Sequence, residues 1–197
     1  IRWINKVLTE LELTELVYAG QDWGGPIGMG ALALSPNLLK GAVLLNTGFN
    51  APTEDRDLSP AHATVKTPIV GEMIIEVVFS IFERLKAVQG DPNSWTPEIA
   101  ELYGKPVYDS GNYKAPLAMM RMVPDGPNHP SASAMLKIEK YVESLEIPAE
   151  IVWGMNDPIL GKGLSAMQTN FPNAPVTKTP AGHFLQEEVP EEISEAL

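Results

Sequence analysis

The feature that most constrains this chain is the alternation of short apolar runs with helix-like segments at both of its ends. In the first third, a helical pattern to about Leu11 precedes the run ELVYAG, a tight turn, a helix from about Gly24 to Leu34 and a second apolar run, GAVLLNTG. The last third repeats this rhythm with AEIVWG, a helix over ILGKGLSAMQTNF, the run PVTKTP and a terminal helix from about Pro190. Apolar strands joined by helices are typical of parallel strands buried on both faces. We therefore predict an α/β class with a doubly wound, mostly parallel sheet.

The middle of the chain, from about residue 49 to residue 146, has a different pattern. Its amphipathic and proline-punctuated segments contain no convincing strand, which predicts a helical insertion on the sheet. We divide the chain into core residues 1–48, a helical cap insertion at 49–146 and core residues 147–197. Some apolar side chains of the insertion either line a substrate pocket or, as is more common for such stripes, pack its own core. They are Phe79, Phe82, Trp95, Met119, Met120 and Met122.

Charge and cysteine content narrow the range of partners. The 14 Lys and Arg residues against 25 Asp and Glu give a formal net charge of −11. Such a surface repels phosphates, so neither nucleic acid nor an anionic membrane is an expected partner. The chain has no cysteine, which excludes a disulfide, a thiolate nucleophile and a cysteine-ligated zinc. No apolar run is long enough to span a bilayer, because Glu72 and Glu76 interrupt the longest candidate. A cytoplasmic location is consistent with the absence of cysteine.

The chain begins at Ile1, in the middle of the amphipathic helical pattern IRWINKVLTELEL. We expect it to be a fragment whose first strands are missing, so that any signal peptide is missing too. Such a fragment exposes a sheet edge, and we predict that it is unstable or aggregation-prone on its own. A single cooperative denaturation transition of ordinary stability would contradict this expectation.

The stretch VYAGQDWGGPIG places Asp22 in a sharp turn between an apolar strand and a glycine-rich helix start. Gly20, Asp22 and Gly24 occupy the positions of a nucleophile elbow, in which a strained turn points the nucleophile away from the sheet. Larger side chains at the two glycines are expected to collide with the neighbouring strand and helix. The positive end of the following helix would stabilise the Asp22 carboxylate. A second interpretation is an ordinary aspartate N-cap of that helix.

The order of two later residues favours the nucleophile. A hydrolase built on this elbow places nucleophile, acid and histidine, in that order, in loops after strands of the sheet. Asp157 follows AEIVWG, and His183 follows PVTKTP. The other two histidines, His62 and His129, lie in proline-flanked parts of the insertion, where we expect surface residues. The plainer interpretations are that Asp157 forms a turn before Pro158 and that His183 is a solvated or core histidine.

Three segments, GQDWGGPIG, WGMNDPILGKG and AGHFLQEEVPEEI, resemble the nucleophile, acid and histidine motifs of the haloalkane dehalogenases, which have the α/β-hydrolase fold. The resemblance covers nearly the whole chain and is weakest from Pro52 to Pro116. The related epoxide hydrolases typically carry histidine at the position of Gln21, so this residue favours dehalogenation. In one branch of the family the acid follows the preceding strand. That position here reads LLNTGF and has no carboxylate, which leaves Asp157 as the candidate acid.

The resemblance implies hydrolysis in two steps, with no metal and no cofactor. Asp22 displaces halide from a small apolar halogenated substrate and forms an alkyl ester, while Trp23 donates its indole N–H to the departing halide. His183, oriented by Asp157, then activates water to cleave the ester. The backbone N–H of Trp23 is one oxyanion donor, and the family takes the second from an upstream loop. The family normally has a further halide donor, often Trp or Asn, on the cap or upstream loop, and Trp95 is a candidate for it.

Two alternatives are kept. Epoxide hydrolysis would use the same three residues together with a cap tyrosine that protonates the epoxide oxygen. The tyrosines in or near the insertion are Tyr103, Tyr108, Tyr113 and Tyr141. The other alternative is a hydrolase-fold protein that binds a ligand without turning it over, although an intact set of nucleophile, acid and histidine argues against it.

Overall fold

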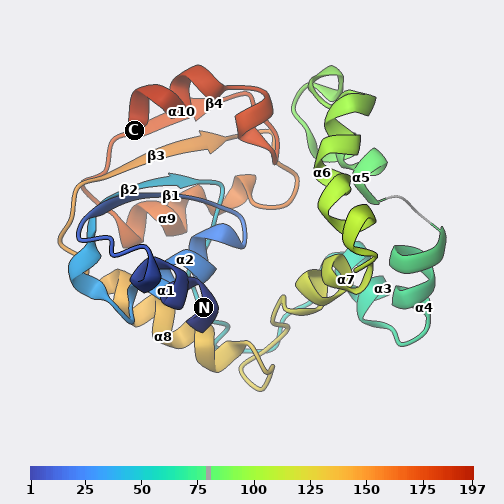
Figure 1. Ribbon diagram of the computed structural model, residues 1–197, viewed down its shortest axis with the longest axis horizontal. Helices are drawn as coiled ribbons and strands as arrows, with labels where there is room; N and C mark the ends of the chain where they lie inside the picture. Colours follow the sequence, from blue (N-terminus) through green and yellow to red (C-terminus); the bar gives the residue numbers. More distant parts are fainter. Residues whose placement is uncertain (79–80) are drawn as a thin grey trace. The chain divides into compact units, whose positions relative to one another are not determined.

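The computed structural model describes residues 1–78 and 81–197, and the chain forms two compact units (Figure 1). The first, called the sheet unit, comprises Ile1–Asn50, Val88–Asp91 and Ala134–Leu197. The second, called the helical unit, comprises Ala51–Ala87 and Pro92–Ser133. The sheet unit therefore takes its residues from three separate parts of the chain.

The sheet unit is built on parallel strands in the order β1-β2-β3-β4. They are β1 (Leu16–Gln21), β2 (Leu39–Leu45), β3 (Ala149–Gly154) and β4 (Val176–Thr179). Each overlaps one of the predicted apolar runs, and all of them point the same way because a helix-containing crossover joins each to the next. The predicted parallel sheet is confirmed.

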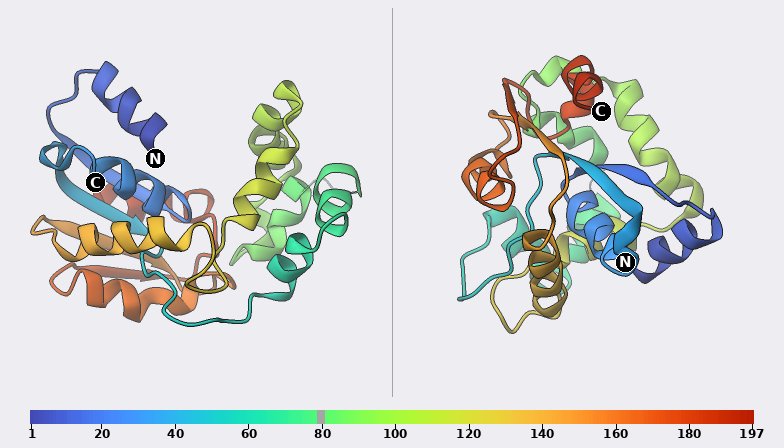
Figure 2. Two further views of the ribbon diagram at one scale, coloured as in Figure 1. Left: turned by 90° about the horizontal axis from the view of Figure 1, so that it is seen from below. Right: turned by 90° about the vertical axis from the view of Figure 1, so that its left-hand side faces the viewer.

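Helices cover both faces of this sheet. They are α1 (Arg2–Glu10), α2 (Gly24–Leu32), α8 (Ala132–Glu143), α9 (Leu164–Asn170) and α10 (Pro190–Ala196), with 3₁₀ turns at Pro36–Leu38, Gly161–Gly163 and Leu185–Glu187. On one face, Val43 and Val152 belong to a core cluster against which Ile193 of α10 packs. The next residue of β3, Trp153, faces the opposite side, because successive strand residues alternate, and its indole N–H donates to the Gly161 carbonyl at 2.9 Å. Figure 2 shows α2, α8 and α9 on that second face, which makes the sheet doubly wound.

The helical unit contains no strand among its described residues, as predicted. Its elements are α3 (Pro60–Lys66), α4 (Val70–Glu72), a π-helical segment (Met73–Val78), α5 (Ile81–Arg84), 3₁₀ turns at Leu85–Val88 and Pro92–Ser94, α6 (Pro97–Ser110) and α7 (Lys114–Arg121). Met120 packs against the buried cluster of Val65, Ile75 and Leu117, which favours the core-packing interpretation for this methionine. Phe79, one of the other apolar candidates, lies outside the described residues.

The helical unit differs from the predicted insertion of residues 49–146 in three places, because residues 49–50, Val88–Asp91 and residues 134–146 belong to the sheet unit. The sequence analysis extends the insertion to residue 146, whereas residues 134–146 group with the sheet unit. The reason is the apolar face of α8, where Ile138 and Val142 are 4% and 1% exposed. Ile138 also packs beside Gly30 of α2, so this helix is part of the sheet unit's core. Its amphipathic pattern alone did not indicate which unit buries it.

Among the described residues β1 pairs with one strand only, β2, and so lies at an edge of the sheet. Val17 on this strand is 53% exposed. Trp3, Leu11 and Leu13, in or just after α1, are exposed as well. An edge strand has unpaired N–H and C=O groups that can bond to a strand of another chain, and exposed apolar side chains beside it stabilise such pairing. This is the physical reason for the aggregation predicted above.

Candidate active site

The predicted site residues follow the strands at one edge of the sheet. Asp22 comes directly after β1, Asp157 lies three residues after β3, and His183 lies four residues after β4. Because the strands are parallel, their carboxyl ends meet at this edge, where open α/β sheets bind their ligands. The structure brings the three side chains together: His183 lies 3.0 Å from Asp157 and 3.9 Å from Asp22, measured between nitrogen and carboxylate oxygen.

Asp22 occupies a strained turn. Its φ of +46° lies in the left-handed region, which costs a non-glycine residue about 1–2 kcal/mol. Backbone and side-chain bonds hold it there: the Asp22 N–H donates to the Asn46 carbonyl at 3.1 Å, and the Asp22 carbonyl accepts from the Thr47 hydroxyl at 2.7 Å and from the Gly25 N–H at 3.1 Å. The Asp22 side chain is 39% exposed, so a small molecule can reach the carboxylate within the sheet unit.

The N-cap interpretation of Asp22 is wrong. The N-cap residue of α2 is Trp23, and no side chain makes a capping hydrogen bond there. The prediction for the two glycines is correct at Gly20 and wrong at Gly24. A Cβ at Gly20 would lie 3.0 Å from the Gly25 Cα, whereas the nearest atom to a Cβ at Gly24 is the Tyr18 hydroxyl oxygen at 3.9 Å.

His183 is held between the two acids. Its Nδ1 lies 3.0 Å from Asp157 Oδ2, and the two side chains are 7% and 0% exposed. An ionised carboxylate can only accept, so Nδ1 carries the proton and Nε2 has the lone pair. Nε2 is the atom that lies 3.9 Å from Asp22 Oδ2, which is too long for a direct hydrogen bond. The nitrogen of the imidazole that is not bound to Asp157 therefore lies near the candidate nucleophile.

Asn46 is a site residue that the sequence analysis missed. Its amide donates to Asp157 Oδ2 at 2.8 Å and to the Gly154 carbonyl at 2.9 Å, and its side-chain oxygen accepts from the Gly154 N–H at 2.7 Å. The signal was its position in LLNTGF, directly after β2 and at the same edge as the acids. A carboxylate at this position would predict a catalytic acid, whereas an amide that orients a carboxylate on the next strand has no comparable signal in the sequence.

The environment of Asp157 determines its charge. Burial favours the neutral carboxyl and would raise its pKa, but hydrogen bonds from His183, Asn46 and the Ile159 N–H together lower the pKa below its ordinary value of 3.8. The Ile159 N–H donates to Asp157 Oδ1 at 2.7 Å, so both carboxylate oxygens have donors. Asp157 is therefore a fixed negative charge beside the imidazole near neutral pH.

Trp23 and Trp95, the two candidate halide donors, belong to different units. Trp23 is half-buried at the start of α2, directly beside Asp22. Trp95, the candidate for a second halide donor, is 4% exposed in the helical unit, and its Nε1–H donates to the Phe82 carbonyl at 2.8 Å. Because an indole has a single N–H, this bond argues against a halide-binding role for Trp95.

The other two histidines and three of the candidate cap tyrosines can each be placed within one unit. His62 and His129 belong to the helical unit, where the His62 ring contacts the Ser59 hydroxyl and the His129 ring accepts from the Ser131 N–H. Within that unit, the ring of Tyr103, one of the epoxide-hydrolase candidates, lies tilted against Trp95, and the ring of Tyr108, another candidate, meets Phe82 edge to face. Tyr141, a third candidate, is part of α8 in the sheet unit, and burial raises the pKa of its hydroxyl.

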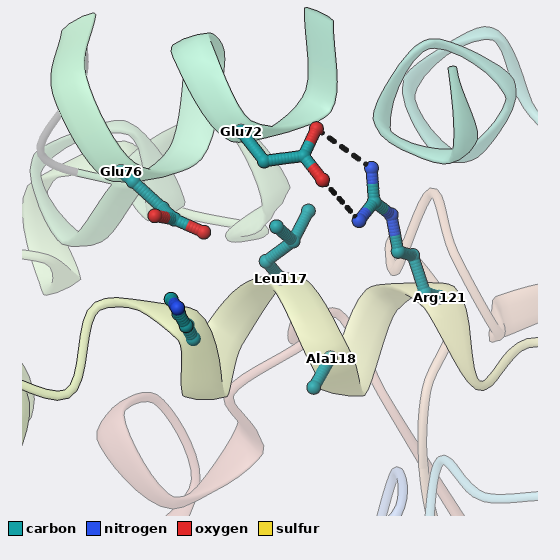
Figure 3. A pocket seen from close by; sticks show the side chains of 6 residues that line it. Glu72, Glu76, Leu117, Ala118 and Arg121 are labelled. Carbon is teal, nitrogen blue, oxygen red and sulfur yellow. Dashed lines mark hydrogen bonds and ion pairs between the residues drawn. The ribbon is translucent and has the colours of Figure 1, made fainter. Parts of the chain in front are cut away.

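A pocket of about 490 Å³ lies within the helical unit, and none of the predicted site residues lines it (Figure 3). Its walls carry Glu72, Glu76, Lys114, Leu117, Ala118 and Arg121. Arg121 binds Glu72 through two hydrogen bonds of 2.6 and 3.0 Å and also donates to the Val65 carbonyl. This pair joins α7 to α4, so we interpret it as a packing element of the helical unit.

Within residues 1–78 and 81–197, no helix combines the length and hydropathy needed to cross a bilayer. The same residues contain no group of three His, Cys, Asp or Glu side chains arranged to hold a metal ion.

A family model described as the alpha/beta hydrolase fold matches residues 1–190. The chain belongs to the α/β-hydrolase fold family. This match and the sheet topology confirm the predicted fold.

Individual relatives of this hydrolase-fold chain carry two different activities. It is 25% identical over 205 residues to a haloalkane dehalogenase of Psychrobacter cryohalolentis, covering 100% of this chain and 64% of the relative. It is 29% identical over 200 residues to a cis-3-alkyl-4-alkyloxetan-2-one decarboxylase of Shewanella oneidensis, covering 96% and 61%. The crystal structure of the haloalkane dehalogenase DbeA from Bradyrhizobium elkani matches with a TM-score of 0.83 at 21% identity, over 98% of this chain and 70% of that one. The chain thus spans a little under two thirds of the length of the curated relatives it matches.

Proposed function

We propose that this chain carries the catalytic residues for hydrolysis of haloalkanes to an alcohol and a halide ion, through an alkyl ester on Asp22. The observation that carries the proposal is the position of His183, which is bound at Nδ1 to a buried acid and turns Nε2 toward the carboxylate on the strained turn. The similarity to haloalkane dehalogenases over the whole chain supports the same reaction class.

The first step is a displacement at carbon. A carboxylate oxygen of Asp22 forms a bond to the halogen-bearing carbon as the carbon–halogen bond breaks, and the bonding electron pair leaves with the halide. The N-terminus of α2 lies beside the carboxylate, and the first N–H groups of a helix have no acceptor within it. The indole N–H of Trp23 is the proposed donor to the departing halide. The substrate is small and apolar, and no cofactor takes part.

The second step is hydrolysis of the ester. His183 Nε2 takes a proton from water, and the resulting hydroxide attacks the ester carbonyl carbon of Asp22. The backbone N–H of Trp23 stabilises the oxyanion that forms. When this intermediate collapses, the bond between the carbonyl carbon and the alkoxide oxygen breaks, and that oxygen takes the proton held by His183 and leaves as the alcohol. The carboxylic acid left on Asp22 loses its proton to solvent, which restores the carboxylate. Asp157 stabilises the imidazolium because it stays ionised in its buried position. His183 thus acts in this half of the reaction and not in the first.

Halide release from 1,2-dibromoethane by the full-length protein tests the proposal. The Asp22→Asn variant should lose at least about 10⁴-fold in rate, since it removes the nucleophile. Asp109→Asn is the matched control, because Asp109 is an exposed aspartate in an ion pair with Lys105 on α6. Equal rates for the two variants would contradict the proposal. Turnover of styrene oxide without halide release from the bromoalkane would favour epoxide hydrolysis instead.

A second candidate is the decarboxylation of an oxetan-2-one, favoured by the 29% identity to a relative with that activity. The ring carbon bonded to the ester oxygen of such a substrate is also an electrophile with an attached leaving group. Incubation with a cis-3,4-dialkyloxetan-2-one, with carbon dioxide and alkene as the measured products, separates the two candidates.

A further inference from the structure

The loop that carries His183 is hydrogen-bonded to groups from two distant parts of the sequence. The His183 N–H donates to the Val88 carbonyl at 2.8 Å, and the His183 carbonyl accepts from the Gln21 side-chain amide at 2.9 Å. Next to it, the Phe184 N–H donates to the Gln89 side-chain oxygen at 2.9 Å, and the Gln89 amide donates back to the Phe184 carbonyl at 3.3 Å. His183 lies in no helix or strand, so its orientation depends on these contacts.

Two of these partners come from a short excursion of the chain. Val88–Asp91 belongs to the sheet unit, whereas the chain on both sides of it belongs to the helical unit. The segment lies between two 3₁₀ turns, Leu85–Val88 before it and Pro92–Ser94 after it, and it contacts the loop that carries His183. The insertion therefore contributes four residues to the packing around the proposed base.

Glu188 joins this excursion to the histidine loop. Its Oε2 accepts from the Gly182 N–H at 2.5 Å and from the Gly90 N–H at 3.1 Å, and its Oε1 accepts from the Asp91 N–H at 2.5 Å. Bonds from N–H groups to a carboxylate are roughly twice as strong as those between neutral groups. One side chain thus satisfies three backbone donors that belong to two segments almost 100 residues apart in sequence.

The two segments approach with no side chain between them. A Cβ at Gly182 would lie 2.3 Å from the Gly90 nitrogen, and a Cβ at Gly90 would lie 2.3 Å from the Pro180 carbonyl oxygen. Glycine at both positions allows this contact. A shift of the excursion is therefore transmitted directly to the backbone beside His183.

We propose that Glu188 and the excursion Val88–Asp91 are positioning elements for His183, fixing the imidazole with Nδ1 on Asp157. This inference rests on the proposed function only for its kinetic consequence. Neither element touches the reacting atoms; they act through the loop. In the proposed reaction the base works only on the ester, so a loss of positioning slows the second step and leaves the first unchanged.

The first test is independent of activity and uses histidine labelled with ¹⁵N in the full-length protein. The ring signals of His183 are assigned by their absence in His183→Phe. The unmodified protein and the control variant Glu195→Gln, at an exposed position on α10, should show the Nδ1–H form alone. Glu188→Gln replaces one accepting oxygen by an N–H donor, and we expect it to shift the ring signals toward a mixture of both neutral forms. Signals identical to those of Glu195→Gln would overturn the proposal.

The second test separates the two chemical steps by rapid mixing with 1,2-dibromoethane. In Glu188→Gln we expect the initial burst of halide at an unchanged rate and a steady-state rate lower by about 10- to 100-fold, because a small misplacement of a catalytic group costs this much. Equal losses in both steps would indicate a merely structural role and overturn the proposal. If Glu188→Gln does not fold, Gln89→Met, which removes the pair of bonds to Phe184, is measured in its place. If the unmodified protein releases no halide, the proposed function fails and the labelling experiment still decides the positioning role.

Discussion

Each of the two units contains a carboxylate bound to a nitrogen-containing side chain, and the two carboxylates differ in burial. In the sheet unit, Asp157 is fully buried and receives hydrogen bonds from a ring, an amide and a backbone N–H. In the helical unit, Glu72 is 41% exposed and is bound by one guanidinium, that of Arg121. The bonds from Arg121, together with backbone hydrogen bonds, lower the pKa of Glu72 to about 2. Burial opposes the lowering of the pKa at both carboxylates, and at Asp157 it is the largest single cause.

The difference shows that a lowered pKa has different consequences at the two sites. A buried carboxylate that loses one partner keeps its charge without solvent, which is expensive. An exposed carboxylate that loses its partner is hydrated instead. Substitutions that break the hydrogen bonds of Asp157 should therefore affect stability and activity strongly, and substitutions that break the ion pair of Glu72 should affect both weakly.

The largest expected effect is on activity. Asp157→Asn keeps the shape of the side chain but presents an amide to Nδ1, which disfavours the required form of the imidazole, and we expect halide turnover to fall by about 10³- to 10⁴-fold. Glu72→Gln is the matched change in the helical unit and should leave turnover within about twofold. Steady-state halide release measures both, and comparable losses would contradict the distinction drawn between the units.

The next effect is on stability. Asn46→Leu leaves Asp157 Oδ2 and both backbone groups of Gly154 without their amide partner, and we expect it to lower the free energy of unfolding by about 2–4 kcal/mol. Asn173→Leu, at an exposed position of the same unit, is the control and should change it by less than about 0.5 kcal/mol. Urea denaturation measures the two variants. An Asn46→Leu protein as stable as its control would show that the buried network is unimportant for folding.

Two neighbouring glycines give a smaller and more local contrast. Gly20→Ala places a methyl group 3.0 Å from the Gly25 Cα and should cost about 1–3 kcal/mol, because the backbone of α2 cannot move aside cheaply. Gly24→Ala has 3.9 Å to its nearest neighbour and should be close to neutral. Thermal denaturation of both proteins measures the difference, and a more destabilising change at Gly24 would mean that the strand–helix approach is wrongly described.

The smallest effect concerns pH and salt. The Glu72 carboxyl has a pKa lowered from 4.5 to about 2, so its ion pair stabilises the folded protein above pH 4.5, and this contribution is lost as the pH falls toward 2. Asp157 follows the same sign, with a contribution present above pH 3.8 and lost below it. Added salt should weaken the exposed pair and leave the buried one unchanged. Acid denaturation of Glu72→Gln and Asp157→Asn at low and high salt checks this, and equal salt sensitivity at the two sites would contradict it.

The parallel sheet and the convergence of Asp22, Asp157 and His183 could be predicted because both follow from strand order. Residues that follow parallel strands lie at one edge whatever the details of packing. The orientation of the site could not be predicted in the same way. Asn46 and Glu188 act through an amide and a carboxylate on backbone groups of other segments, and no spacing in the sequence identifies such partners. The sequence also does not predict which unit contains α8, because an amphipathic pattern indicates that one face of a helix is buried but not which surface covers it.

Mass spectrometry of the Asp22 peptide tests the central claim most directly. The full-length His183→Phe protein is incubated with 1,2-dibromoethane, digested and compared with an equally treated His62→Phe control. The proposed mechanism predicts that the peptide containing Asp22 gains the mass of a bromoethyl group in the first protein and not in the control, because ester formation needs the carboxylate and ester cleavage needs the imidazole. An unmodified Asp22 peptide in the His183→Phe protein, when the unsubstituted protein releases halide, would contradict the mechanism.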